Sequence, residues 1–185
     1  ILDYQLADTV LLYGSLARGF KSGGFNGAVV FTPEEVTRFD PETLTSYEVG
    51  FKAQSSDRRL TLNMSAFYYD YKDLQVYTLI NPPNGGGVPI QVLDNAATAT
   101  IYGLEANTVV KITPEFSVNG SLGLLKAKFD EFISDVAASD YTGNTLARSP
   151  KVTANIGADL DLPIPGNKRI LANFDASYRS KIFFD

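Results

Sequence analysis

Residues 45–54 read TSYEVGFKAQ, and apolar and polar side chains alternate there at every step. The apolar set is Tyr47, Val49, Phe51 and Ala53, and the polar or small set is Glu48, Gly50, Lys52 and Gln54. Successive side chains of a β-strand point to opposite faces of a sheet, so a period of two indicates a strand. The stretch therefore predicts a strand with one apolar and one polar face.

The same alternation recurs along the chain. It runs through KVTANIGADLDL, residues 151–162, and through LTLNMSAFYY, residues 60–69. A soluble β-sandwich also alternates, with its apolar face turned toward a second sheet. Its strands usually have about five or six residues, whereas a strand that spans a bilayer needs about 9–11. The length of these segments favours strands that cross a membrane.

The connections between the predicted strands alternate between short and long. The strands are expected at about 9–17, 43–54, 59–77, 90–111, 116–129, 151–162 and 168–180. Short turns are expected at 55–58, 113–115 and 163–167, and long polar connections near 18–42, 78–89 and 130–149. This is the layout of an outer-membrane β-barrel, whose tight turns all lie on one edge. We predict an all-β fold, an antiparallel up-and-down meander that forms about seven strands of a larger transmembrane barrel.

The composition argues against several classes of function. The chain has 185 residues, with 16 Lys and Arg against 21 Asp and Glu, and its formal net charge of −5 argues against nucleic-acid binding. It contains no cysteine and no histidine, which removes disulfides, thiolate metal sites and the commonest general base. An enzyme would need a carboxylate pair, and Asp159 and Asp161 lie on a polar strand face without a sign of a cleft. We expect no catalytic residue, no cofactor and no metal site.

Aromatic side chains gather just before the long connection at 78–89. They are Phe67, Tyr68, Tyr69, Tyr71 and Tyr77. Tyr and Phe form girdles where barrel strands leave the hydrocarbon, because the ring is apolar and the hydroxyl is hydrated. We expect such a girdle here, and the alternative is an ordinary packed aromatic cluster.

Residues 14–24, GSLARGFKSGG, come close to a phosphate-binding loop. Gly14 and Gly19 have the spacing of that motif, but Phe20 separates Gly19 from Lys21 and Ser22. The following GGFNG cannot begin the helix that the motif requires. The stretch is better explained as the end of a strand and the start of a glycine-rich loop.

Five stretches resemble barrel strands of the TonB-dependent outer-membrane receptors of Gram-negative bacteria. They are LLYGSLARGFKSGGFN (11–26), FDPETLTSYEVGFKAQ (39–54), LTLNMSAFYYDYKDLQV (60–76), LDNAATATIYGLEAN (93–107) and GNTLARSPKVTANIG (143–157). The resemblance covers essentially the whole chain. It implies a receptor in the outer membrane, embedded in lipid, that imports a scarce ligand, most often an iron–siderophore complex. It also implies a plug domain inside the barrel and the TonB complex as partners.

The resemblance assigns expected roles to individual residues. Glu48, Lys52 and Glu105 would face the lumen or the plug, with a structural role. The tentative ligand-binding residues, in the loops and at the rim, are Arg18, Lys21, Asn26, Tyr77, Asn84, Tyr141 and Arg148. Basic residues at a membrane rim are equally expected from anionic outer-leaflet lipid, so their charge alone does not separate ligand from lipid.

Residues 1–185 are expected to be a partial barrel domain without its plug. Asp3 to Leu6 look like a strand end, and we expect both ends of the sequence to be cuts through a longer chain. Two alternatives remain open. One is a small closed outer-membrane pore of eight strands, and the other is a soluble β-sandwich that binds a ligand through its loops.

Overall fold

The structure is a computed structural model that describes residues 1–27, 36–81, 89–134 and 139–184. The described residues contain no helix, and therefore none that is long and apolar enough to cross a membrane. Asn84, one of the expected ligand-binding residues, lies outside the described ranges.

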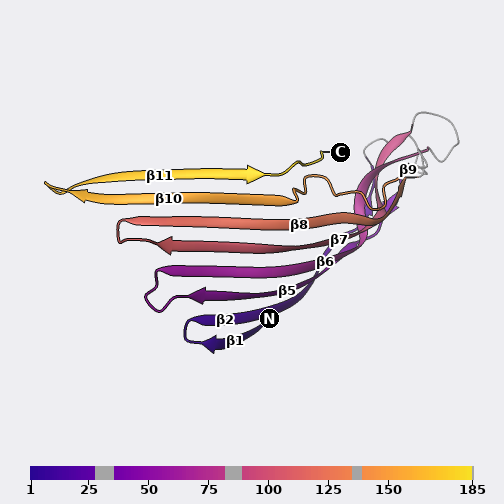
Figure 1. Ribbon diagram of the computed structural model, residues 1–185. Coiled ribbons are helices and arrows are strands. Elements are labelled where there is room, and N and C mark those ends of the chain that lie inside the picture. Colours follow the sequence, from indigo (N-terminus) through magenta and orange to yellow (C-terminus); the bar gives the residue numbers. More distant parts are fainter. Residues whose placement is uncertain (28–35, 82–88, 135–138, 185) are drawn as a thin grey trace.

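The described strands form one large antiparallel sheet and one small hairpin (Figure 1). The main strands are β1 (Leu2–Ala7), β2 (Val10–Lys21), β5 (Glu42–Gln54), β6 (Leu60–Ile80), β7 (Ile90–Lys111), β8 (Phe116–Ser134), β10 (Val152–Ile164) and β11 (Lys168–Arg179). The short strands are β3 (Gly24–Phe25), β4 (Arg38–Phe39) and β9 (Ser139–Asp140). The sheet order is β1-β2-β5-β6-β7-β8-β10-β11, with β9 paired to β8 and with β3–β4 as a separate hairpin. The strands therefore follow one another as a meander, and the predicted fold class is confirmed.

The seven predicted segments all appear as strands, with two kinds of difference. The residues expected to be a strand end near the N-terminus belong to β1, which pairs with β2 from Leu2 opposite Gly14 to Ala7 opposite Val10, with a register shift between Gln5 and Ala7. In addition, β6 and β8 continue to Ile80 and Ser134, into regions expected to be loops. These extensions are held by pairing with β7 and β9, which a period in one segment cannot reveal.

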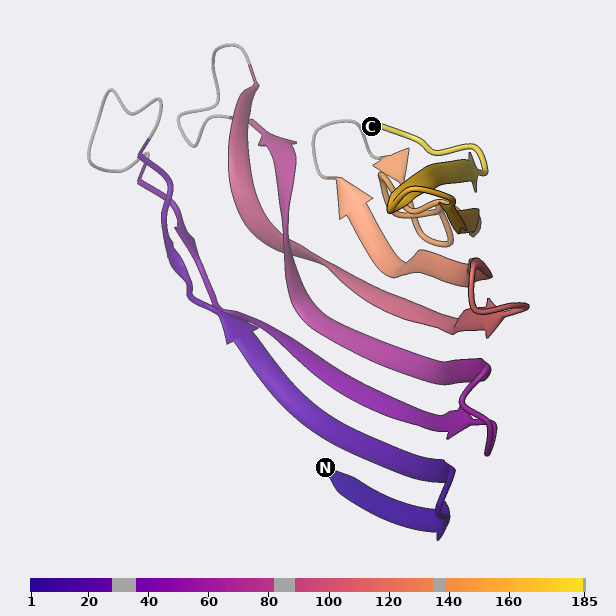
Figure 2. The same cartoon turned by 90° about the vertical axis from the view of Figure 1, so that its left-hand side faces the viewer.

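All tight turns lie on one edge of the sheet, which we call the turn edge, and all long connections lie on the other, which we call the loop edge. Figure 1 shows the β1–β2, β5–β6, β7–β8 and β10–β11 turns at the same end. Toward the opposite edge the sheet curves, and β6 and β7 bend away from their neighbours (Figure 2). The β6–β7 register shifts twice there, between Tyr71 and Leu74 and between Leu74 and Val76. Such bulges bend a strand and increase its twist.

The register aligns side chains of like polarity across the whole sheet. Val49 lies opposite Gly14 and Ala66, and Ala66 lies opposite Leu104. The side that carries these residues is the apolar face, which also bears Leu12, Phe51, Met64, Leu122 and Ile156. The other side is the polar face, which bears Tyr13, Ser15, Glu48, Ser65, Glu105, Asn119 and Asn155.

The apolar face is exposed rather than packed against a second layer. Val49 is 62% exposed, Ile156 54% and Phe174 61%. The few buried apolar residues, Val92, Ala97, Ala99 and Ala127, lie instead on β7 and β8. An apolar surface this wide must be covered by another apolar medium. A single sheet without a facing sheet argues against the soluble sandwich.

The sheet is open. Its terminal strands, β1 and β11, each pair with one neighbour only among the described strands. The main strands therefore do not close on themselves, which argues against a small pore formed by this chain alone. An open, curved sheet with unpaired edges is what a piece of a larger barrel wall looks like.

Tyrosines form a row on the apolar face, and this corrects the expected girdle. The Tyr47 and Tyr68 ring centroids are 6.3 Å apart, and those of Tyr68 and Tyr102 are 6.5 Å apart. Phe67 and Tyr69 instead stack on the polar face, with centroids 4.9 Å apart. Consecutive residues of one strand cannot all face the same way, so the run at 67–71 supplies a packed cluster on one face and one girdle residue on the other.

Candidate functional site

The edge that carries the long connections holds a network of amide side chains, built first on Asn26. The Asn26 Nδ2 donates to the Leu93 carbonyl at 2.8 Å and to the Thr37 Oγ1 at 3.0 Å. The Leu93 N–H donates back to the Asn26 Oδ1 at 2.9 Å. The side chain of Asn26 therefore pairs with β7 as a backbone amide of a further strand would, and it fastens the β3–β4 hairpin to β7.

Asn95 makes a second attachment of the same kind. Its Nδ2 donates to the Asp40 carbonyl at 2.8 Å and to the Asp73 carbonyl at 2.7 Å. Its Oδ1 accepts from the Asp40 N–H at 2.6 Å. Asp73 has a φ of 54° within the bulged part of β6, and the bulge turns its carbonyl toward Asn95. One side chain thus ties together the connection after β4, the bulge of β6 and the start of β7.

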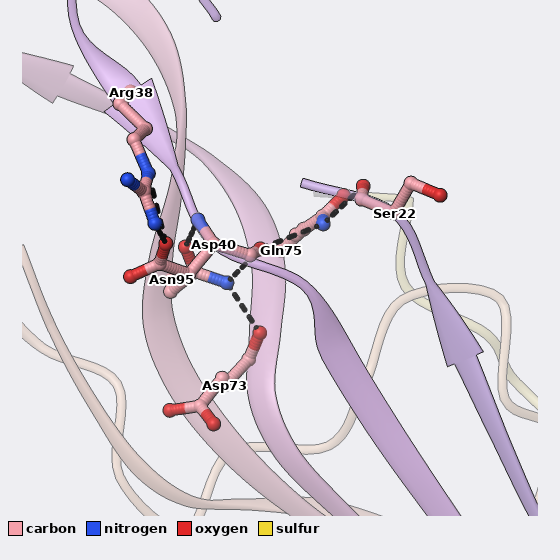
Figure 3. A network of polar contacts seen from close by, with 6 residues as sticks. All are labelled: Ser22, Arg38, Asp40, Asp73, Gln75 and Asn95. Atoms are coloured by element: carbon pink, nitrogen blue, oxygen red, sulfur yellow. Dashed lines mark hydrogen bonds and ion pairs between the residues drawn. The ribbon is translucent and has the colours of Figure 1, made fainter. Parts of the chain in front are cut away.

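Gln75 completes the network, and Figure 3 shows Gln75 and Asn95 with their partners Ser22, Asp40 and Asp73. It is 7% exposed, and its Nε2 donates to the carbonyls of Ser22 and Asp40, both at 3.0 Å. Its backbone N–H donates to the Glu42 Oε2 at 2.9 Å. We call Asn26, Gln75 and Asn95 the amide clamp. The clamp holds both ends of the first long connection, at Ser22 and at Asp40, against β6 and β7.

The polar face carries a second group of polar contacts, farther from the loops. The Tyr13 hydroxyl donates to the Glu48 Oε1 at 2.8 Å. The Lys52 Nζ lies 5.7 Å from the centroid of the Tyr13 ring, a cation–π distance. Glu105 lies opposite Ser65 in the β6–β7 register, on the same face. The three residues expected to face a lumen therefore share one face.

Arg18 and Lys21, the two cations near the end of β2, point to different faces. Arg18 lies opposite Thr45, in step with Leu16 opposite Tyr47 on the apolar face. Lys21 lies opposite Glu42, in step with Ser15 opposite Glu48 on the polar face. Both residues were expected among the ligand-binding residues in the loops and at the rim, and the structure places them on opposite faces.

The remaining predicted site residues are spread along the loop edge. Tyr77 lies opposite Leu93 and is 70% exposed. The ring of Tyr141 packs on that of Phe132 with centroids 5.1 Å apart. Arg148 has a φ of 57°, and its N–H donates to the Phe183 carbonyl at 2.8 Å. The structure brings these three side chains to one edge of the sheet and does not join them into one pocket.

Two of the clamp residues were not anticipated from sequence. Gln75 and Asn95 each stand within a segment correctly expected to be a strand, where a polar residue is normal on a polar face. The sequence offered one local signal. Asp73 lies two residues before Gln75, and Asp94 lies directly before Asn95. Because aspartate is depleted in strands, an aspartate inside an expected strand indicates an irregularity such as a bulge.

The described acidic residues of the third long connection do not form a metal site. The described residues contain no group of three or more carboxylates that could hold a metal ion. Asp130 pairs with the Lys128 ammonium at 3.1 Å and accepts a hydrogen bond from Thr100. Hydrogen bonds from the Thr142 hydroxyl and N–H lower the pKa of Asp140. These carboxylates are each engaged locally.

The comparison with protein families gives the class of protein to which this geometry belongs. Residues 2–183 match the family described as TonB dependent receptor-like, beta-barrel. The match covers nearly all of the chain, so the chain belongs to the TonB-dependent receptor family, as part of its β-barrel. The family is one of outer-membrane receptors and not of enzymes.

Individual relatives agree with this assignment. The chain is 28% identical, over 151 residues, to the Pesticin receptor of Yersinia enterocolitica and to that of Yersinia pestis. The match to the first covers 82% of this chain and 20% of the receptor. The chain thus spans about a fifth of the length of these curated relatives.

Solved structures show the same fold. The ferric yersiniabactin uptake receptor FyuA from Yersinia pestis superposes with a TM-score of 0.76 at 20% identity, covering 99% of this chain and 25% of that one. BauA, the ferric preacinetobactin receptor from Acinetobacter baumannii, gives a TM-score of 0.69 at 18% identity, covering 98% and 25%. At these identities the likeness establishes the fold alone.

Proposed function

We propose that the chain is part of the barrel wall of an outer-membrane receptor that imports an iron–siderophore complex with the help of the TonB complex. The observation that carries the proposal is one sheet with an exposed apolar face, a polar face and its long connections on one edge. Such a sheet suits a wall between lipid and a polar lumen. The solved relatives named as receptors for ferric yersiniabactin and ferric preacinetobactin support an iron–siderophore ligand.

In this proposal the two faces have separate tasks. The apolar face contacts lipid, and the polar face lines the lumen. Glu48, Lys52 and Glu105 then offer charged hydrogen-bonding groups to a plug domain elsewhere in the full-length receptor. The TonB complex acts on that plug, and the wall itself performs no chemistry.

The ligand end would be the edge that carries the long connections. Lys21, Tyr77, Tyr141 and Arg148 lie along this edge, and Asn84 belongs to the connection after β6. Lys21 and Arg148 complement the charge of an anionic ferric siderophore. The amide clamp, including Asn26, holds the first long connection in place rather than contacting the ligand itself.

The function is tested by uptake of ⁵⁵Fe-labelled ferric yersiniabactin into cells whose only receptor is the full-length protein. We expect uptake that stops when the TonB complex is deleted. If the cells took up another ligand in a TonB-dependent manner but no ferric yersiniabactin, the proposed transport mechanism would stand and only the proposed ligand would be wrong. Uptake that persists without the TonB complex would contradict the transport mechanism.

The site is tested by a matched pair of substitutions on one strand. Lys21→Gln removes a cation from the polar face, and Arg18→Gln removes one from the apolar face. We expect Lys21→Gln to weaken siderophore binding by up to about fivefold, the worth of an exposed ion pair, and Arg18→Gln to leave it unchanged. The reverse order would mean that the assignment of the two faces is wrong.

A further inference from the structure

Toward the loop edge, the apolar face ends abruptly, and charged side chains begin directly beyond its last apolar residues. On β7 the apolar face carries Tyr102, Leu104, Ala106, Thr108 and Val110, and on β8 it carries Val118, Gly120, Leu122 and Leu124. The β7 series spans nine residues, or about 27 Å along the strand. That is the length with which a tilted strand crosses the hydrocarbon. No charged residue stands among these positions.

The tyrosine row marks the boundary toward the loops. Tyr102 lies opposite Lys126, and the next apolar-face pair toward the loops is Thr100 opposite Lys128. The Lys126 Nζ lies 5.6 Å from the centroid of the Tyr102 ring. Lys126 and Lys128 are two residues apart on one strand, so both ammonium groups leave the sheet on the same side.

These two lysines are only partly neutralised. Lys128 is 40% exposed in its side chain and pairs with Asp130 at 3.1 Å. Among the described residues, no carboxylate lies within ion-pair distance of Lys126, whose ammonium group contacts the Tyr102 ring. Arg18 and Lys72 stand on the same face at the same end of the sheet, with Asp70 4.0 Å from Lys72. In a chain of net charge −5, cations thus collect at this one level.

We propose that Lys126 and Lys128, above Tyr102, form a docking site for the phosphate of an outer-leaflet lipid. The site lies on the apolar face, at the level where the hydrocarbon ends and headgroups begin. Two ammonium groups on one side of a strand complement the charge of a phosphate, and the Tyr102 ring packs against the acyl chains of the same lipid. The position excludes a contact with the imported ligand, which passes on the other face.

The test uses the full-length receptor in detergent and native mass spectrometry with a short-chain phosphatidic acid as the probe. Phosphatidylcholine of the same chain length is the reference lipid. The variant Lys126→Gln/Lys128→Gln removes both charges. A basic residue near a lipid surface contributes about fivefold in affinity, so we expect the dissociation constant for phosphatidic acid to rise by at least that factor. Phosphatidylcholine binding should not change.

Two controls separate a phosphate site from other causes. Lys126→Arg/Lys128→Arg keeps both charges and should bind like the parent. Lys111→Gln removes a charge at the turn edge, in step with the polar face, and should also bind like the parent. Unchanged binding in the double Gln variant would overturn the proposal, as would an equal loss in either control. The single variant Lys126→Gln serves if the double variant fails to fold, and it should lose about fivefold. The proposal rests on the apolar face contacting lipid and does not depend on which ligand the receptor imports.

Discussion

The two edges of the sheet are closed by different kinds of interaction. At the turn edge, the β5–β6 turn is closed by Ser55, whose N–H donates to the Leu60 carbonyl and whose hydroxyl oxygen accepts from the N–H groups of Arg59 and Leu60. These partners are at most five residues apart. At the loop edge, the side-chain hydrogen bonds of the amide clamp join residues 22 to 67 positions apart, except for the bond from Asn26 to Thr37, which spans 11. The interactions at the turn edge are local in sequence, and those at the loop edge form only when the sheet is assembled.

This difference has a physical consequence. A local turn can form as soon as its two strands pair, since it needs no other element. The clamp closes only after β6 and β7 have paired and bulged, and opening it need not disturb the sheet below. The loop edge can therefore change its conformation while the rest of the sheet stays intact, and ligand-binding loops are generally drawn from such low-stability regions.

The largest effect is expected from Asn95→Ala, which tests whether the loop edge is held by the clamp. The substitution removes three hydrogen bonds to Asp40 and Asp73. Two of these bonds join Asn95 to the 36–41 segment, and at about 0.5–1.5 kcal/mol each the free energy of opening that segment should fall by about 1–3 kcal/mol. Native-state hydrogen exchange of the full-length receptor measures this, and exchange should accelerate at 36–41 while β5–β6 turn amides stay unchanged.

Asn107→Ala is the matched control, because Asn107 lies on the same strand and its side chain makes no hydrogen bond to any residue that the structure describes. It should leave exchange at 36–41 unchanged. If the two variants behaved alike, or if Asn95→Ala also loosened the turn edge, the two edges would not be independent.

The difference between the edges also explains what could be predicted from sequence. The period of two at 45–54 and 151–162 is a property of each strand alone, and it placed the strands and their faces. The tight turns followed from the spacing between segments. The clamp could not be predicted, because Gln75 and Asn95 acquire their partners only through the β6 bulges and the return of the first loop. Likewise, Arg18 and Lys21 could be assigned to opposite faces only once β2 was known to continue to Lys21, beyond the strand end expected at residue 17.

A smaller and strictly local effect is expected at the turn edge from Ser55→Ala. The hydroxyl oxygen accepts from two backbone N–H groups and its proton is donated to the Asp57 Oδ1 at 2.5 Å. Its loss should cost about 1 kcal/mol, seen as a lower midpoint of urea unfolding of the receptor in lipid vesicles. Siderophore binding and exchange at 36–41 should be unaffected. An altered ligand affinity would show that the two edges are coupled.

A gain in stability is expected from Arg58→Gly in the same turn. Arg58 has a φ of 58°, a left-handed conformation that costs a non-glycine residue about 1 kcal/mol. Glycine removes that strain but loses more entropy on folding, so the net gain should be a few tenths of a kcal/mol. Arg59→Gly, one residue later and without a positive φ, should instead destabilise. Equal effects of the two substitutions would exclude strain at Arg58 as the cause.

The smallest effect is expected from two carboxylate substitutions compared between neutral and acidic pH, with one carboxylate at each edge. Hydrogen bonds from the Ser55 hydroxyl and the Arg59 N–H lower the pKa of Asp57 at the turn edge, as the bonds from Thr142 lower that of Asp140 among the loops. A carboxylate with a depressed pKa stabilises the fold above its unfolded pKa of about 3.9 and loses that contribution as the pH falls through its folded value. Asp57→Asn should therefore raise exchange of the Arg59 amide near neutral pH, and the difference from the parent should vanish in acid. Asp140→Asn should do the same for the Thr142 amide and leave Arg59 unchanged. Both carboxylates are fully exposed, so neither substitution should move the global unfolding midpoint. A clear shift in that midpoint would mean that one of these two local structures stabilises the whole sheet.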